Sequence, residues 1–157
     1  TACVDLLRDS YTRRDRVAVV VAAGKDAYVA VPPTRSVDLA VARLAQVRTG
    51  GRTPLAEGLA QALGVIERAA RTDPTRRPLL VVLTDGRATA GPGAADRAMA
   101  AADSVARQQI SSLVVDCEQG MIRLGLAAEL ARRLGAQYAA MDDLEVAGLA
   151  GRIGSVA

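Results

Sequence analysis

The sequence contains no histidine, tryptophan or phenylalanine, and its three tyrosines are its only aromatic residues. Without histidine, the chain lacks the commonest general base and the commonest zinc ligand, which excludes Ser-His-Asp and Cys-His catalysis and metalloprotease sites. The few aromatic residues exclude a platform on which the bases of single-stranded nucleic acid could stack. We therefore expect neither histidine-dependent catalysis nor binding of single-stranded nucleic acid by base stacking.

Cysteines and long apolar runs are also scarce. Cys3 and Cys117 lie far apart and match neither a zinc-binding nor a redox spacing, so we expect reduced thiols in an intracellular protein. No apolar run approaches the length of a membrane span and no signal-peptide pattern opens the chain, which predicts a cytoplasmic protein. The 20 basic and 17 acidic residues are interspersed, which favours a solvated helical surface over a nucleic-acid interface.

The length of 157 residues indicates a single domain over residues 1–157. Apolar runs and helical periodicity alternate, which predicts a Rossmann-like, doubly wound α/β fold with a mostly parallel sheet, helices on both faces and one antiparallel edge strand. The expected strands cover residues 16–23, 27–31, 79–83, 110–115 and 137–141. The expected helices cover residues 1–14, 37–47, 54–72, 94–108, 123–134 and 144–153. Ser36 is the expected N-cap of the second helix, and Pro32-Pro33 is expected to end the second strand.

The central stretch is the run of branched apolar residues at 79–83, which has no alternation and is typical of a strand buried on both faces. Asp85 follows it directly, before the turn residue Gly86. Ligands of open α/β sheets bind beyond the carboxyl ends of the strands, so we expect binding or chemistry at Asp85. The alternative is that Thr84, Asp85 and Gly86 simply end a strand with good turn residues.

A second loop, residues 50–55, is expected at the same end of the sheet. The Thr53 hydroxyl and the Asp85 carboxylate are hard oxygen ligands of the kind that Mg²⁺ prefers. The alternative for Thr53 is structural, because threonine followed by proline is a common cap and first residue of a helix.

Residues 50–55, 79–89 and 114–127 resemble von Willebrand factor A (integrin I-like) domains, most closely those at the C-terminal end of magnesium chelatase D subunits. In this family a metal-ion-dependent adhesion site (MIDAS) combines an Asp-x-Ser-x-Ser loop, a threonine and an aspartate. The resemblance implies that Thr53 and Asp85 are the threonine and aspartate ligands of Mg²⁺. No Asp-x-Ser-x-Ser sequence occurs in the chain.

The resemblance also implies that a central strand is missing between the strands at 16–23 and 79–83. Two apolar strands with unpaired backbone groups facing a gap would be costly. We therefore predict that the chain is a fragment of a longer one, or that another polypeptide supplies the strand. Mg²⁺ binding by these residues alone is expected to be weak or absent, because an octahedral ion needs more ligands.

The resemblance implies a non-catalytic, metal-dependent protein-interaction domain of an ATP-dependent metal chelatase that acts on a tetrapyrrole. A carboxylate of a partner would complete the metal shell. The implied partners are an AAA+ ATPase subunit and the large tetrapyrrole-binding subunit. Arg52 and Arg87, with Gly51 and Gly86 beside them, flank the site and are candidates to bind acidic partner residues, although both arginines could simply be solvated.

Asp116 and Glu118 follow the strand at 110–115 and are candidates to shape the same crevice, although Glu118 could instead cap the next helix. Cys117 is interpreted as a packing residue, since no base accompanies it.

The rival hypothesis is a Mg²⁺-dependent phosphate- or nucleotide-handling enzyme that uses Asp85 and the Gly50-Gly51 pair near a helix N-terminus. The sequence has neither a P-loop motif nor a Gly-x-Gly-x-x-Gly motif, and its one lysine, Lys25, lies in a predicted turn. These absences favour the interaction domain.

Overall fold

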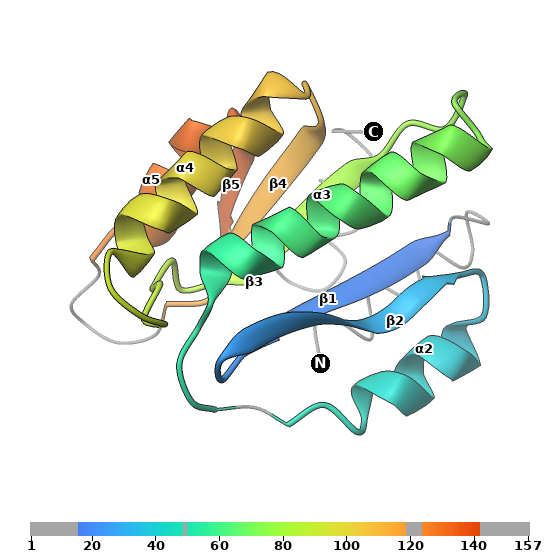
Figure 1. Cartoon of the computed structure of the whole chain (residues 1–157), viewed down its shortest axis with the longest axis horizontal. Coiled ribbons are helices and arrows are strands. Elements are labelled where there is room, and N and C mark those ends of the chain that lie inside the picture. Colours follow the sequence, from blue (N-terminus) through green and yellow to red (C-terminus); the bar gives the residue numbers. More distant parts are fainter. Residues whose placement is uncertain (1–15, 49, 119–123, 142–157) are drawn as a thin grey trace.

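The computed structural model describes residues 16–48, 50–118 and 124–141 of the chain (Figure 1). Within them the elements, numbered as in Figure 1, follow in the order β1 (Val17–Ala23), β2 (Asp26–Thr34), α2 (Val37–Leu44), α3 (Leu55–Thr72), β3 (Leu79–Thr84), α4 (Ala94–Arg107), β4 (Ser111–Asp116), α5 (Leu126–Leu134) and β5 (Gln137–Ala140). This order confirms the predicted alternation of strands and helices. The helices predicted at 1–14 and 144–153 lie outside the described residues.

The strands form a parallel sheet in the order β3-β4-β5 and an antiparallel hairpin of β1 and β2. In the parallel sheet Val82 lies opposite Val114, and Val114 opposite Tyr138. The helices α4 and α5 make the connections between consecutive parallel strands, as parallel pairing requires a crossover. The mixed α/β fold with a parallel sheet and an antiparallel pair is therefore confirmed.

The two sheets are not joined by pairing of β1 with β3 among the described residues. Every residue of β1 is only half-buried although the strand is entirely apolar, whereas β4 is buried from Ser112 to Asp116. The prediction that the strand at 79–83 is buried on both faces was wrong for the described residues, because in β3 only Leu80 is buried and Leu83 is exposed. This is the arrangement expected if a further strand belongs between β1 and β3. The further strand itself stays a prediction.

The main core lies between the parallel sheet and three helices, α3, α4 and α5. Figure 1 shows α3 and α4 in front of the strands of this sheet. Leu80 and Val114 contribute from the sheet, and Leu59, Ala102 and Leu130 from the three helices. Since small alanines dominate the inner side of α4, the helix can approach its neighbours closely. A second cluster on the other face of the sheet contains Leu113, Val115 and Ala139.

The hairpin is held by two helices, which Figure 1 shows on opposite sides of it. A Cβ added at Gly58 of α3 would lie 2.9 Å from the Ala22 Cβ of β1, so a glycine is needed where this helix meets the strand. On the other helix, Ala40 packs with Val31 of β2. These contacts hold the two strands of the hairpin between α3 and α2.

The predicted end of the second strand at Val31 was wrong. β2 continues through Pro32 and Pro33 to Thr34, which lies opposite Val17. Both prolines are exposed, and β2 pairs on one side only with β1, so their missing N–H groups disturb no described ladder. The sequence pattern alone could not distinguish a strand end from an edge strand.

Other boundaries differ by a few residues. Ser36 is the N-cap of α2, as predicted, and its hydroxyl accepts a hydrogen bond from the Leu39 N–H at 3.2 Å. That helix ends at Leu44, three residues before the predicted end. The helix predicted from residue 123 is described from Leu126, because Gly125 before it adopts a left-handed conformation with φ of 69°.

Candidate functional site

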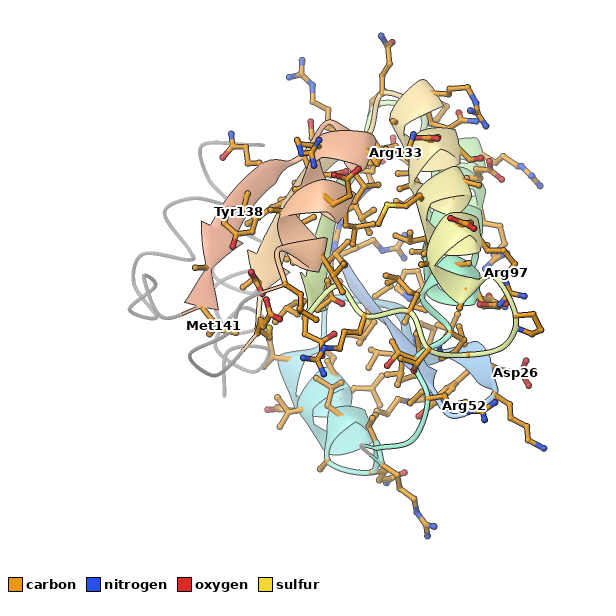
Figure 2. All side chains as sticks on the ribbon, turned by 90° about the vertical axis from the view of Figure 1, so that its left-hand side faces the viewer. Asp26, Arg52, Arg97, Arg133, Tyr138 and Met141 are labelled. Atoms are coloured by element: carbon orange, nitrogen blue, oxygen red, sulfur yellow. The ribbon has the colours of Figure 1, made fainter. Side chains whose placement is uncertain are left out.

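Four segments meet at the end of the fold where β1 and the parallel strands finish. We call residues 23–26, 50–54, 85–90 and 116–118 the crest. The first two are joined by a hydrogen bond from the Gly24 N–H to the Arg52 carbonyl (2.7 Å). Residues 116–118 are joined to the end of β3, directly before residues 85–90, where the Cys117 N–H donates to the Thr84 carbonyl (2.9 Å). Figure 2 places Arg52 and Asp26 on one side of the molecule, and Tyr138 and Met141 of the β5 region on the other.

The two loops that carry the predicted metal ligands are fastened together at Thr53. The Thr53 N–H donates to the Thr89 hydroxyl at 2.8 Å, and the Thr89 N–H donates to the Thr53 carbonyl at 3.1 Å. The expected convergence of these loops is therefore present. Thr89 lies in the segment 79–89 that resembles the family, but no sequence pattern indicated this role.

Thr53 is not the N-cap of α3. The helix starts at Leu55, its cap residue is Pro54, and no side chain caps it. The Thr53 backbone is instead held by Thr89, and its side-chain hydroxyl makes no hydrogen bond within the described part of the chain. The alternative that Thr53 caps α3 is therefore wrong, and among the described residues its hydroxyl keeps unused donor and acceptor capacity.

Asp85 follows β3 and its side chain is 42% exposed. One carboxylate oxygen, Oδ1, accepts a hydrogen bond from the Arg87 N–H at 2.9 Å, which makes the tight turn after the strand. The other oxygen, Oδ2, lies 3.8 Å from Arg87 Nε. The carboxylate is thus held in place by its own loop and still reaches solvent.

The oxygen atoms at the crest match only part of what Mg²⁺ needs. The Asp85 carboxylate and the Thr53 hydroxyl have the right chemistry, since Mg²⁺ prefers hard oxygen ligands. Within residues 16–48, 50–118 and 124–141, no group of three or more His, Cys, Asp or Glu side chains could hold a metal ion. The two residues fit Mg²⁺ as part of a shell that other groups must complete, and their role as ligands stays a prediction.

The two glycines predicted beside the partner contacts have packing roles. Gly86 is buried with φ of 79°, and a Cβ added there would lie 2.3 Å from the Ala127 N of α5. Gly51 has φ of 86° and lies against the hairpin turn, where an added Cβ would be 3.5 Å from the Gly24 Cα. Contact of either glycine with a partner stays a prediction.

The two candidate arginines differ in their surroundings. Arg52 is exposed, and its side chain has no ion pair within the described residues. Arg87 is half-exposed and lies 3.8 Å from a carboxylate oxygen of Asp85 and 3.8 Å from one of Glu118. In the sequence the two arginines were equivalent candidates. In the structure Arg87, unlike Arg52, lies within ion-pairing distance of charged crest residues.

Asp116 and Glu118 are buried, with 3% and 4% of the surface of the whole residue exposed. The Asp116 carboxylate accepts hydrogen bonds from the Glu118 N–H (2.8 Å) and the Tyr138 hydroxyl (2.6 Å). Both oxygens of Glu118 lie 3.0 Å from the Leu124 N–H, which donates to them. These bonds give both carboxylates a part in shaping the loop after β4, and Tyr138 is a contributor that the sequence did not reveal.

Cys117 lies between these carboxylates. Burial raises the pKa of the Cys117 thiol above its ordinary value, and the nearby charges of Asp116 and Asp85 raise it further. Because the thiolate is the reactive form, we expect alkylation by iodoacetamide at pH 8 to be several-fold slower than for a free cysteine. Peptide mass spectrometry separates Cys117 from Cys3. A rate for Cys117 equal to that of free cysteine would contradict this.

Comparisons with known proteins agree with this arrangement. The family model of the von Willebrand factor type A domain matches residues 1–87. The chain is similar to the uncharacterised protein Rv2850c of Mycobacterium tuberculosis, with 50% identity over 143 residues, 91% of this chain and 23% of that protein. It is also similar to the magnesium-chelatase 60 kDa subunit of Cereibacter sphaeroides, with 38% identity over 157 residues, 96% of this chain and 27% of that subunit.

Among solved structures, the fold is similar to that of the conserved hypothetical protein BatB from Bacteroides thetaiotaomicron. The TM-score is 0.73 at 20% identity, covering 99% of this chain and 84% of that one. This likeness concerns the fold alone. The chain spans about a quarter of the length of the two relatives named above. In the described residues, no helix combines the length and the apolar character that crossing a membrane requires.

Proposed function

The chain belongs to the von Willebrand factor type A domain family, and from that premise we propose that it is a metal-dependent docking domain of a chelatase-type complex. The sequence similarity to magnesium-chelatase subunits supports a complex of the chelatase type. The proposed partners are an AAA+ ATPase subunit and a large tetrapyrrole-binding subunit. In this proposal the domain binds partners and carries out no chemical step itself.

The observation that carries the proposal is the pair of hydrogen bonds between Thr53 and Thr89. Thr89 lies in the loop that begins with Asp85. The two bonds bring to one end of the fold a part-exposed carboxylate and a hydroxyl that makes no hydrogen bond within the described residues. Asp85 and Thr53 would hold Mg²⁺, which would supply an acceptor for a carboxylate of the partner. The remaining ligands would be water and the partner, together with the family's Asp-x-Ser-x-Ser loop where the protein carries one.

Arg52 is the proposed contact for acidic partner residues beside the metal. It is exposed, it is unpaired in the described part of the chain, and its loop is braced against the hairpin turn by the bond from Gly24. A guanidinium group can bind a carboxylate through two parallel hydrogen bonds. The hairpin turn also carries Lys25, which is exposed at the same end of the fold.

Removal of the metal tests the proposal. Binding of the purified AAA+ and porphyrin-binding subunits of a magnesium chelatase to the intact protein is measured by surface plasmon resonance in excess MgCl₂. EDTA is expected to weaken binding at least about tenfold, since the bridging cation is lost. Calcium or manganese should restore part of it. Affinity that is unchanged by EDTA would contradict metal-dependent docking.

A further inference from the structure

Arg87 lies between two carboxylates that come from different loops. Its Nε is 3.8 Å from Asp85 Oδ2, and its Nη2 is 3.8 Å from Glu118 Oε1. The side chains of Arg87 and Asp85 are 51% and 42% exposed, whereas that of Glu118 is 2% exposed. One guanidinium group thus faces a part-exposed carboxylate on one side and a buried carboxylate on the other.

The buried Glu118 carboxylate needs a positive charge nearby. Burying an ionised carboxylate is costly unless it is paired and hydrogen-bonded. Its hydrogen bond comes from the Leu124 N–H, which precedes α5. Among the described residues, Arg87 is the only positively charged side chain within 4 Å of the Glu118 carboxylate.

The same loop is packed tightly against α5. Gly86 contacts the backbone of Leu126 and Ala127, and Glu118 is bonded to Leu124 just before that helix. A change in the position of Arg87 therefore acts on residues that touch the first turn of α5. The Arg52 side chain, by contrast, makes no ion pair or hydrogen bond within the described residues.

We propose that Arg87 acts inside the domain, as a counter-ion shared by Asp85 and Glu118, and not as a partner contact. When a cation binds Asp85, Arg87 moves away from Asp85 and pairs with Glu118. This exchange couples occupation of the metal site to the loop after β4 and to the start of α5. The exchange step, but not the counter-ion role, rests on the proposed function.

The counter-ion role is tested without metal, by a double-mutant cycle of Arg87→Gln and Glu118→Gln in the intact protein with EDTA. Equilibrium unfolding in urea is the measurement. Arg87→Gln is expected to reduce the folding equilibrium constant about five- to tenfold, since it leaves a buried carboxylate unpaired. In the Glu118→Gln background the same change should cost less than about twofold. Equal losses in the two backgrounds overturn the proposal.

Arg133→Gln is the matched control, because Arg133 pairs with Asp103 at 3.2 Å and both side chains are well exposed, at 47% and 37%. Its effect should stay within about twofold, as for other surface pairs. If Glu118→Gln does not fold, Arg87→Lys takes its place. Arg87→Lys keeps the charge and is expected to recover most of the loss, and a loss as large as that of Arg87→Gln overturns the counter-ion role.

The exchange step is tested by calorimetric titration with MgCl₂. Arg87→Gln is expected to tighten Mg²⁺ binding about three- to tenfold, since it removes a positive charge that competes for Asp85. Arg133→Gln should leave the affinity unchanged. Unchanged or weaker Mg²⁺ binding by Arg87→Gln overturns the exchange. The titrations use the intact protein, and absence of Mg²⁺ binding in the wild type and in every variant overturns both the exchange and the proposed function, while the unfolding cycle still decides the counter-ion role.

Discussion

Replacement of Gly86 by alanine is expected to destabilise the protein by at least about 3 kcal/mol. The added Cβ would lie 2.3 Å from Ala127 N and 2.4 Å from the Leu126 carbonyl carbon, both backbone atoms of α5 that no rotamer change can move. The φ of 79° adds a conformational cost for any residue with a Cβ. Thermal unfolding followed by circular dichroism should show a midpoint lowered by roughly 6–12 °C.

Gly93→Ala is the matched control for Gly86→Ala. Gly93 also has a positive φ, of 61°, but a Cβ there would meet nothing within 4 Å. This variant should lose only about 1 kcal/mol, the cost of the backbone conformation. The difference between the two variants measures the steric contact with α5. Similar losses in both would show that the contact between the Asp85 loop and α5 is loose.

Replacement of Asp85 by asparagine is expected to weaken Mg²⁺-dependent binding of the chelatase partners at least about thirtyfold. Asparagine keeps an oxygen that can accept the hydrogen bond from the Arg87 N–H, now at 2.9 Å, so the turn should be preserved. Only the charge needed by the cation is lost. Surface plasmon resonance in MgCl₂ measures the change, and the unfolding midpoint shows that the fold is intact.

Asp103→Asn provides the comparison for Asp85→Asn, since Asp103 is a surface carboxylate paired with Arg133 on α4 and α5, outside the crest. Its partner affinity should stay within about twofold of the wild-type value. Equal affinity of the wild-type and Asp85→Asn proteins would remove Asp85 from the site. Hydrolysis of a nucleotide or phosphate ester that is lost in Asp85→Asn would instead favour the rival enzyme hypothesis.

The α/β fold was predictable because its signals are local in the sequence. The unbroken apolar run of β3, the stripe of apolar residues on α3 and the serine that caps α2 each report their own structure through side-chain periodicity or capping. Helix and strand ends were less predictable. Pro32 and Pro33 looked like a strand end, since the sequence does not reveal that β2 is paired on one side only.

In the candidate site, too, some features were predictable from the sequence and others depend on the tertiary structure. Asp85 could be chosen from the sequence because a carboxylate after an apolar strand is a recognisable pattern, and Thr53 because its loop resembles that of von Willebrand factor A domains. That Thr53 is fastened by Thr89, and does not cap α3, depends on two loops 36 residues apart in sequence. No local pattern carries that information.

By itself, the sequence determined the order and type of the elements, the absence of histidine chemistry and the identity of the two candidate metal ligands. Only the tertiary structure decided which groups around them are already engaged. In the structure, Arg52 is exposed and Arg87 lies close to Asp85 and Glu118. Gly86 is buried against α5. The physical reason is that periodicity and capping act over a few neighbouring residues, whereas ion pairing and steric contact depend on which distant segments the packed fold brings together.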